Sequence, residues 1–272
     1  MPMDEQVLIE TPRGRLVGML HRPPGPASAP GVVFCHAFGE ERKSSALAMA
    51  RLARAVAATG RPVLRFDYYG CGDSEGAFIE SDAATRLDDV RAAVRFLQHA
   101  GGREEFLLLG LRLGGTLAAR AAEEAAGCAG LVLVEPVADG RAYFDGLTRR
   151  SLVRGMLTRG SGGAPEGGAH REAAGEGDVL DLDGFAMRPA AARSLGALGI
   201  RSGEVAFGGP VLVCQVHFRD AARPDMEGVC AAYRTAGAAV TFERLVLPPF
   251  WNRVDVAVAP ELDRVVCAWL SH

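Results

Sequence analysis

Short apolar runs, each rich in branched residues and ended by turn-forming residues, recur along the chain and predict β-strands. The predicted strands are Gln6–Ile9, Leu16–Leu20, Gly31–Cys35, Pro62–Phe66, Phe106–Leu109, Leu131–Val134, Val211–Val216 and Val240–Leu247. Later segments have apolar residues at helical spacing and predict helices at Ser45–Thr59, Ala83–His99, Leu113–Ala126 and Met226–Ala236. An opening hairpin followed by alternating strands and helices predicts an α/β fold, with a mainly parallel twisted sheet covered by helices on both faces.

Four short segments directly follow predicted strands. They are Cys35–His36, Asp67–Tyr68, Gly110–Gly114 and Glu135–Pro136. Because the carboxyl ends of parallel strands meet at one edge of a sheet, we expect these segments to form one rim, where ligand sites of such sheets lie.

The interval from about Asp139 to Gly209 interrupts this alternation and is too long for a simple connection within a compact domain. Its centre, residues 159–177, is rich in glycine and polar residues. Aromatic and apolar residues at Tyr143–Phe144 and Phe185–Leu198 flank the centre and favour a lid over the rim. Partial disorder of the centre is the alternative. We expect one domain over residues 1–272, with 139–209 as an insertion.

The composition is that of a globular protein, with 49% hydrophobic and 23% charged residues. A net charge of -3 and the lack of a basic tail argue against nucleic acid as a partner. Met1–Leu20 contains neither the apolar core of a signal peptide nor a membrane span, so we expect a cytoplasmic protein. The cysteines stand singly, without a C-x-x-C pair, which favours buried reduced thiols. We expect no metal site and no cofactor.

The segment Phe106–Thr116 carries the most informative motif, an apolar strand that runs through a glycine-framed turn into an alanine-rich helix. This is the frame of the nucleophile elbow, Gly-x-Ser-x-Gly, of the α/β-hydrolase fold. Gly110 and Gly114 keep the frame, but Arg112 stands at the serine position. A guanidinium stays protonated at physiological pH and has no useful nucleophilicity, so the acyl-enzyme route through this position is closed.

The acid and the histidine of a serine triad would follow the elbow in that order. The final loop, Leu247–Arg253, contains no histidine, and His272 lies beyond the closing helix at the end of the chain. Asp220 follows a predicted strand at the place of the acid, although a lone aspartate in a polar loop is more often an ordinary loop residue. Two of the three triad positions therefore lack the required residue.

A displaced nucleophile is the remaining route to hydrolysis. Ser74, the pair Ser44–Ser45 and Cys35 lie near the expected rim. Cys35 and His36 are neighbours on a strand and point to opposite faces, which argues against a nucleophile and base pair. Ser74 is more simply explained as a side chain that bonds the backbone of its own loop.

Five segments share a pattern with a known family: His36–Ser44, Leu64–Gly76, Gly110–Gly114, Glu135–Gly140 and Pro249–Trp251. Over about Gly31–Leu262 the chain resembles the type 2 exosortase A system-associated hydrolases. The specific features are the arginine in the elbow and the Phe-Trp pair in the final loop. The resemblance implies the α/β-hydrolase fold and a setting among exopolysaccharide and exosortase genes, but no reaction. Ala37, Gly39 and Glu135 depart from the family pattern, which leaves a relative in another biosynthetic pathway open.

Arg112, at the start of a predicted helix, requires an anion nearby. The helix dipole and the free amides of the first turn already favour negative charge there. The anion is either internal, from Glu40, Glu41 or Glu135, or external, from the carboxylate or phosphate of a ligand. Both alternatives apply if a glutamate pairs with Arg112 in the free protein and a ligand displaces that glutamate on binding.

His36 begins the loop that shapes the oxyanion hole in this fold, where the backbone amides of Phe38 and Leu113 are the expected donors. His36 with Glu40 or Glu41 forms a candidate pair for proton transfer or elimination. The alternative is a histidine that bonds only the loop backbone. Phe250 and Trp251 either stack on a sugar or acyl chain or pack under the lid.

Two functions from different classes follow from these residues. The first is a non-catalytic protein that binds an anionic acyl, sugar or phosphate-bearing metabolite, or a protein of the same pathway. The second is an enzyme without a serine triad, in which Arg112 orients the substrate while His36 and a glutamate move a proton. Hydrolysis by a displaced nucleophile is a third possibility. The fold cannot decide among them, because it hosts many chemistries.

Overall fold

The computed structural model describes residues 3–160, 179–182, 184–253 and 258–271. An 8-stranded sheet in the order β1-β2-β4-β3-β5-β6-β9-β10 forms its centre. The strands are β1 Met3–Thr11, β2 Gly14–Arg22, β3 Gly31–Cys35, β4 Val63–Phe66, β5 Phe106–Leu111, β6 Cys128–Val134, β9 Val211–His217 and β10 Val240–Val246. β2 pairs antiparallel with β1 and with β4, and all other neighbours are parallel. The predicted strands and the mainly parallel sheet are confirmed.

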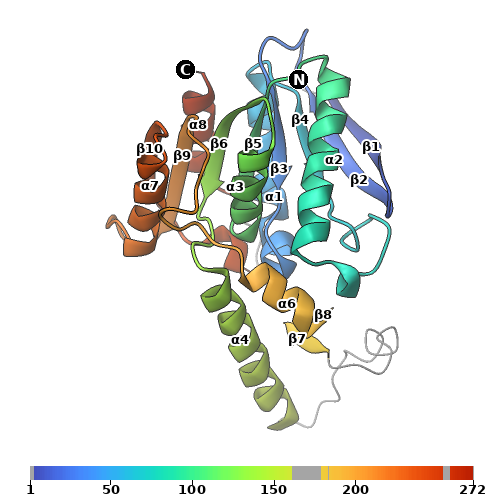
Figure 1. The fold of residues 1–272 in the computed structure, drawn as a ribbon, viewed down its shortest axis with the longest axis vertical. Helices are drawn as coiled ribbons and strands as arrows, with labels where there is room; N and C mark the ends of the chain where they lie inside the picture. The colour runs from blue at the N-terminus through green and yellow to red at the C-terminus, as the bar shows by residue number, and fades with distance from the viewer. Residues whose placement is uncertain (1–2, 161–178, 183, 254–257, 272) are drawn as a thin grey trace.

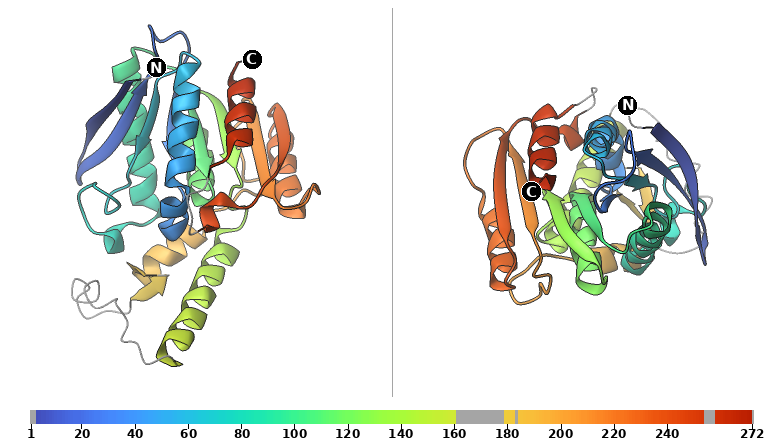
Figure 2. Two further views of the ribbon diagram at one scale, coloured as in Figure 1. Left: turned by 180° about the vertical axis from the view of Figure 1, so that it is seen from behind. Right: turned by 90° about the horizontal axis from the view of Figure 1, so that it is seen from above.

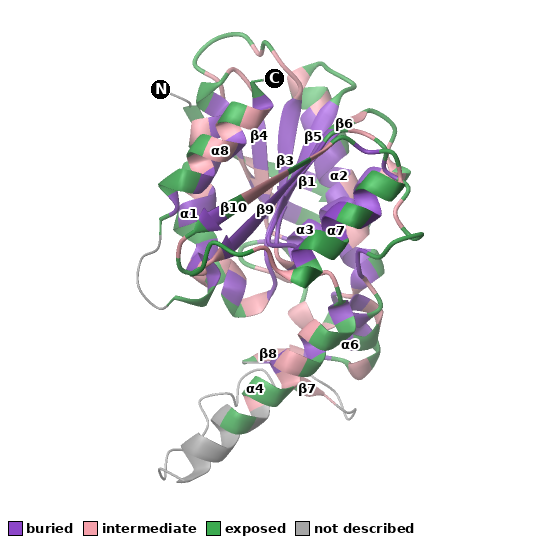
Figure 3. Cartoon of the chain, turned by 90° about the vertical axis from the view of Figure 1, so that its left-hand side faces the viewer, coloured by how far each residue is buried: buried purple, intermediate pink, exposed green. Residues whose placement is uncertain are grey.

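Helices cover both faces of this sheet (Figures 1 and 2). One face carries α1 Gly39–Ala58 and α8 Pro260–Leu270, and the other carries α2 Ala83–Gly101, α3 Leu113–Glu124 and α7 Pro224–Thr235. Each face has its own core, and alternate residues of one strand serve different cores: Val33 packs with α2 and α3, whereas Val32 packs with α1. Side chains on both faces of the central strands are therefore buried (Figure 3), which explains why those strands are apolar throughout.

The start of α1 differs from the prediction. The helix begins at Gly39, ahead of the predicted Ser45. The prediction began too late because the first turn of the helix is polar and has no apolar periodicity. Glu40 and Glu41 in that turn are favourable there, since the positive end of the helix dipole attracts acidic side chains. The helix α2 ends before Gly102, which takes the left-handed φ of 62° that glycine adopts most easily.

The interval 139–209 forms a separate group of elements beyond the carboxyl ends of the strands (Figure 1). It contains α4 Gly140–Gly160, β7 Leu180–Leu182, β8 Phe185–Met187 and α6 Pro189–Gly196. We call these elements the cap. A third apolar cluster joins the cap to the body, with Phe144 and Leu195 of the cap packed near Phe38 and Leu113 of the body. The glycine-rich stretch predicted at 159–177 lies largely outside the described residues, and the role of the cap as a lid stays a prediction.

Within the described ranges, no helix combines the length and the apolarity that a membrane crossing requires.

Candidate functional site

The backbone around Arg112 is that of a nucleophile elbow. β5 ends at Leu111, Arg112 takes the positive φ of 55°, and α3 begins at Leu113. The flanking glycines are required sterically: a Cβ on Gly110 would lie 2.3 Å from the carbonyl oxygen of Gly114, and a Cβ on Gly114 would lie 2.2 Å from that of Cys35. The strand, turn and helix of the elbow are therefore present, while the side chain at its tip is a cation.

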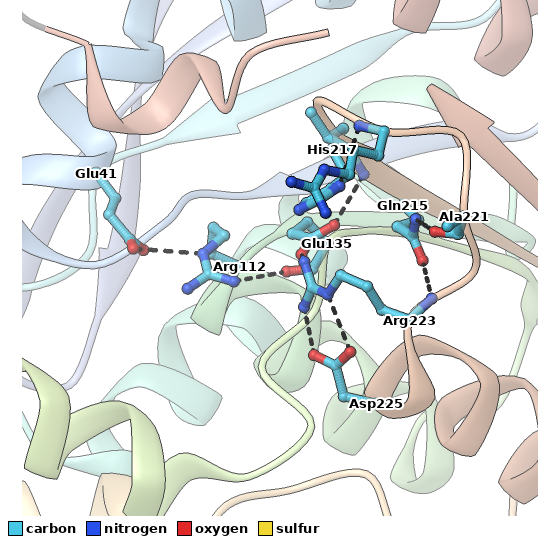
Figure 4. A network of polar contacts seen from close by, with 10 residues as sticks. Glu41, Arg112, Glu135, Gln215, His217, Ala221, Arg223 and Asp225 are labelled. Carbon is cyan, nitrogen blue, oxygen red and sulfur yellow. Dashed lines mark hydrogen bonds and ion pairs between the residues drawn. The ribbon is translucent and has the colours of Figure 1, made fainter. Parts of the chain in front are cut away.

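Four segments of the chain surround the Arg112 guanidinium, and Figure 4 shows its contacts with Glu41 and Glu135. Its Nε lies 3.3 Å from Oε1 of Glu41 on α1, and its Nη1 donates to the backbone carbonyl of Glu135, also at 3.3 Å. The guanidinium carbon lies 5.5 Å from the ring centre of Tyr143 on α4 and 5.3 Å from that of Trp251. Aromatic faces at this range attract a cation. The site therefore holds a fixed positive charge where serine hydrolases carry their nucleophile.

Of the three glutamates predicted as internal partners of Arg112, the one whose carboxylate contacts the guanidinium is Glu41. Glu41 is 6% exposed, and its second carboxylate oxygen accepts a hydrogen bond of 2.9 Å from the Tyr143 hydroxyl. Burial, followed by the negative charge of Glu41, raises the pKa of Tyr143 well above its ordinary value, so the hydroxyl stays protonated and donates. Glu40, in contrast, is exposed and pairs with Lys43 at 2.7 Å.

Glu135 offers Arg112 only its backbone, because its carboxylate turns to the other side. One carboxylate oxygen accepts a 2.8 Å bond from the Val216 amide, and the other pairs with Arg223, which also pairs with Asp225 (Figure 4). The residue is 1% exposed and has a φ of 46°. Sequence reasoning missed Arg223. Its position just before α7, in the loop where serine hydrolases place the acid, is the signal that would have drawn attention to it.

The described residues at the other two triad positions lie at the surface or in the core. Asp220 lies at the surface, where its carboxylate, 65% exposed, pairs with Arg244 at 3.3 Å. After β10, the short helix η2 Phe250–Asn252 buries Phe250 and Trp251, which are 1% and 4% exposed, in the core beside α1. Both rings thus lie in the core of the body and outside the apolar cluster of the cap, and their stacking on a ligand stays a prediction. Trp251 in addition presents its ring to Arg112.

His36 is buried and neutral near pH 7. Burial first, and then the positive charges of Arg65 and Arg42, lower its pKa well below the usual value. Among the described residues, neither Glu40 nor Glu41 forms a hydrogen bond with the ring; their carboxylates bond Lys43, Arg112 and Tyr143 instead. The carboxylate partners expected for proton transfer are thus engaged elsewhere.

The predicted oxyanion donors, the amides of Phe38 and Leu113, lie on two loops that touch. A Cβ on Gly114 would meet the carbonyl oxygens of both Cys35 and His36, which shows how closely the His36 loop packs on the elbow. Within the described part of the chain, no backbone or side-chain acceptor bonds these two amides. They remain able to donate to a ligand.

The alternative nucleophiles have structural contacts. The Ser74 hydroxyl donates to the carbonyl of Asp67 at 2.6 Å and accepts from the Val17 amide at 2.9 Å, as expected for a side chain that bonds its own loop. The Ser45 hydroxyl donates to the carbonyl of Glu41 at 2.6 Å. Burial raises the pKa of Cys35 to about 12, so its thiol stays protonated.

The sheet order, the cap and the elbow together define the α/β-hydrolase fold. A family model described as serine aminopeptidase, S33, matches residues 27–161. This range includes the elbow and ends before β9 and β10, whose following loops carry the acid and the histidine in serine hydrolases. No curated protein sequence matches the chain.

Solved structures with this fold align over almost the full length. An α/β serine hydrolase homologue from Coxiella burnetii is 19% identical, with a TM-score of 0.57 over 98% of this chain and 97% of that one. Est1E from Butyrivibrio proteoclasticus, solved with ferulic acid, is 16% identical, with a TM-score of 0.67 over 97% and 98%. The Pyrococcus furiosus esterase Pf2001 is 15% identical, with a TM-score of 0.66 over 99% and 91%. At these identities the likeness establishes the fold and leaves the reaction open.

Proposed function

We propose that this chain is an α/β-hydrolase-fold protein without serine hydrolase chemistry, which binds the anionic end of a small metabolite at Arg112. The observation behind the proposal is that the Arg112 guanidinium is only partly hydrogen-bonded within the protein. Its bonds to Glu41 and to the Glu135 carbonyl are both long, at 3.3 Å, and its Nη2 donates to no described residue. The side chain is 18% exposed, so part of the guanidinium is accessible. A planar donor with unused N–H groups matches a carboxylate or phosphate.

The surroundings of Arg112 support an anion that carries an apolar or sugar portion. The cap cluster places Phe144, Leu147 and Leu182 over Phe38 and Leu113 of the body. Pockets that combine apolar walls with a few convergent polar groups are typical of small-molecule sites. We therefore favour an acyl, sugar or phosphate-bearing metabolite, with its charged end at Arg112 and the rest of the molecule toward the cap.

Proton transfer at His36 is the second candidate function. The lowered pKa of the ring leaves a neutral imidazole near pH 7, which is the form that accepts a proton, but the burial that lowers this pKa also disfavours the imidazolium that would result. The engagement of Glu41 with Arg112 and Tyr143 weakens this candidate, because no described carboxylate assists the ring. In such an enzyme the substrate itself would have to supply the carboxyl group that assists His36.

The biological setting forms a separate part of the proposal. The sequence resemblance suggests an exopolysaccharide-linked or other biosynthetic pathway, with a pathway protein as a possible partner. We propose the cytoplasm as its location. Neither inference bears on the ligand chemistry at Arg112.

Thermal unfolding in the presence of inorganic phosphate, glucose 1-phosphate and octanoate tests the proposal. An anion that binds at Arg112 raises Tm by on the order of 3 °C or more at ten times its Kd. The rise is lost in Arg112→Met and reduced in Arg112→Lys, which keeps the charge but not the planar fork. Arg22→Met is the matched control, since Arg22 is an exposed partner of Glu5 on the β1-β2 hairpin.

Two results would contradict the proposal. The first is an equal rise of Tm in Arg112→Met and wild type, which would leave the arginine a structural residue. The second is covalent labelling of a serine in the native protein by a fluorophosphonate, which would show serine hydrolase chemistry at another position. Turnover of a bound anion that is lost in His36→Asn would instead favour the second candidate function.

A further inference from the structure

Cys71 lies in a tight loop between β4 and the short helix η1 Phe78–Glu80. The Cys71 amide donates to the carbonyl of Tyr68 at 2.9 Å, and its own carbonyl accepts from the Ser74 amide at 3.1 Å. Its sulfur lies 3.7 Å from Nη2 of Arg86 on α2. The backbone of the loop thus holds the sulfur beside a cation.

Arg86 is a buried cation that lacks a full set of partners. The residue is 2% exposed, and its Nε has no hydrogen-bond partner among the described residues. Three aromatic rings surround the guanidinium carbon, those of Tyr68 at 4.9 Å, Phe38 at 5.3 Å and Phe78 at 5.5 Å. No described carboxylate pairs with it. Aromatic faces offset only part of the cost of burying a charge, so an additional anion near the guanidinium is favourable.

The nearest buried carboxylate on the same helix serves another group. Asp89 accepts a 2.8 Å bond from the Tyr69 amide. Burial raises the pKa of Asp89 to about 6, although the Tyr69 amide and Arg86 oppose the shift. The group in contact with the Arg86 guanidinium is therefore the Cys71 sulfur and not this carboxylate.

Cys71 differs from the other cysteines of the chain. Burial raises the thiol pKa of Cys35, Cys128, Cys214, Cys230 and Cys267, which disfavours their thiolates. Cys71 is partly exposed and contacts a guanidinium. Reactive cysteines occur in partly exposed, electropositive surroundings of this kind. The sequence predicts buried reduced thiols, whereas Cys71, Cys128 and Cys267 are only partly buried, and of these three Cys71 contacts a guanidinium.

We propose that Cys71 is a reactive thiol that undergoes exchange with small-molecule disulfides. Cys71 loses its proton to solvent, and its sulfur attacks one sulfur of the disulfide. The new bond joins Cys71 to that half of the reagent, while the old disulfide bond breaks and the other half leaves as a thiolate. Arg86 stabilises the negative charge on the attacking sulfur. The proposal is independent of the ligand at Arg112.

Peptide mapping of the native protein tests the assignment, with dithiobis(2-nitrobenzoate) as an anionic disulfide and dithiodipyridine as a neutral one. We expect Cys71 to react at least about tenfold faster than Cys267, which is partly exposed but contacts no cation in the described structure. The anionic reagent should favour Cys71 over Cys267 more strongly than the neutral reagent does. The fast phase is absent in Cys71→Ser and retained in Cys267→Ser.

The role of Arg86 is tested in Arg86→Gln and in Arg86→Lys, which keeps the charge. Slower modification of Cys71 in a folded Arg86→Gln, with partial recovery in Arg86→Lys, supports the proposal. A Cys71 that reacts no faster than Cys267 in the wild type overturns it, whatever the Arg86 variants do. Two results would overturn the assigned role of Arg86. They are a rate of Cys71 modification unchanged in Arg86→Gln, and an anionic reagent no more selective for Cys71 than the neutral one.

Discussion

The contact between Arg112 and Glu41 gives a quantitative prediction that a double-mutant cycle tests. The variants are Glu41→Gln, Arg112→Met and the combination of both. The paired atoms are 3.3 Å apart, and the side chains are 18% and 8% exposed. Opposite charges about 4 Å apart attract by about 4 kcal/mol at an effective dielectric constant near 20. The cycle isolates this pairwise attraction, because the desolvation of each group cancels between the variants, so we expect a coupling free energy of about 2–4 kcal/mol.

Urea denaturation of the four proteins measures the coupling, as the difference between the double variant and the sum of the single variants. Each single variant should itself lose stability, because the remaining charge stays buried without its partner.

A surface ion pair of the same chain is the control for this cycle. Glu5 and Arg22 lie 2.7 Å apart, with side chains 44% and 40% exposed. Such pairs contribute about 0.5 kcal/mol or less. If the coupling of the elbow pair is no larger than that of Glu5 and Arg22, the guanidinium is not held by Glu41, and the electrostatic description of the site is wrong.

Three further predictions concern the elbow and the loop before it. Arg112→Ser alone gains no labelling by a fluorophosphonate, because the loop between β10 and α8 contains no histidine to act as the base; intact mass checks this, and a labelled variant contradicts it. In Gly114→Ala the new Cβ would lie 2.2 Å from the Cys35 carbonyl, so the free energy of unfolding falls by about 3 kcal/mol or more. Gly228→Ala has open space and serves as the control in urea denaturation. The folded pKa of His36 lies below its unfolded value, so the unfolded chain takes up the proton first as the pH falls. Below about pH 6.5 the wild type therefore loses up to about 1.4 kcal/mol per pH unit that His36→Asn retains, and equal slopes in the two proteins would refute this.

The fold was predictable because its signals are local. Alternate burial of neighbouring residues leaves apolar runs in the strands, and the elbow requires small residues on both sides of its tip. Gly110 and Gly114 therefore identify the turn even with Arg112 between them. The start of α1 was missed for the opposite reason, since its first turn is polar and has no apolar pattern to read.

The partners of the candidate site were predictable only in part. Sequence reasoning required an anion near Arg112 and offered three glutamates, but Glu40 and Glu41 are neighbours, and only the direction of α1 decides between them. Glu135 looked equivalent, although its carboxylate is turned toward Arg223. That turn depends on the packing of β6 against β9, which no local pattern records.

The polar contacts around Arg112 also bear on how fast the native state is lost. Glu41 is 71 residues from Arg112 and 102 from Tyr143, and Glu135 is 88 from Arg223. Contacts between segments so far apart require large loops to close and are made once most of the sheet has assembled. Interactions that form after the folding transition state slow unfolding with little effect on the rate of folding. The substituted elbow thus contributes to the lifetime of the folded chain, in addition to any ligand that it binds.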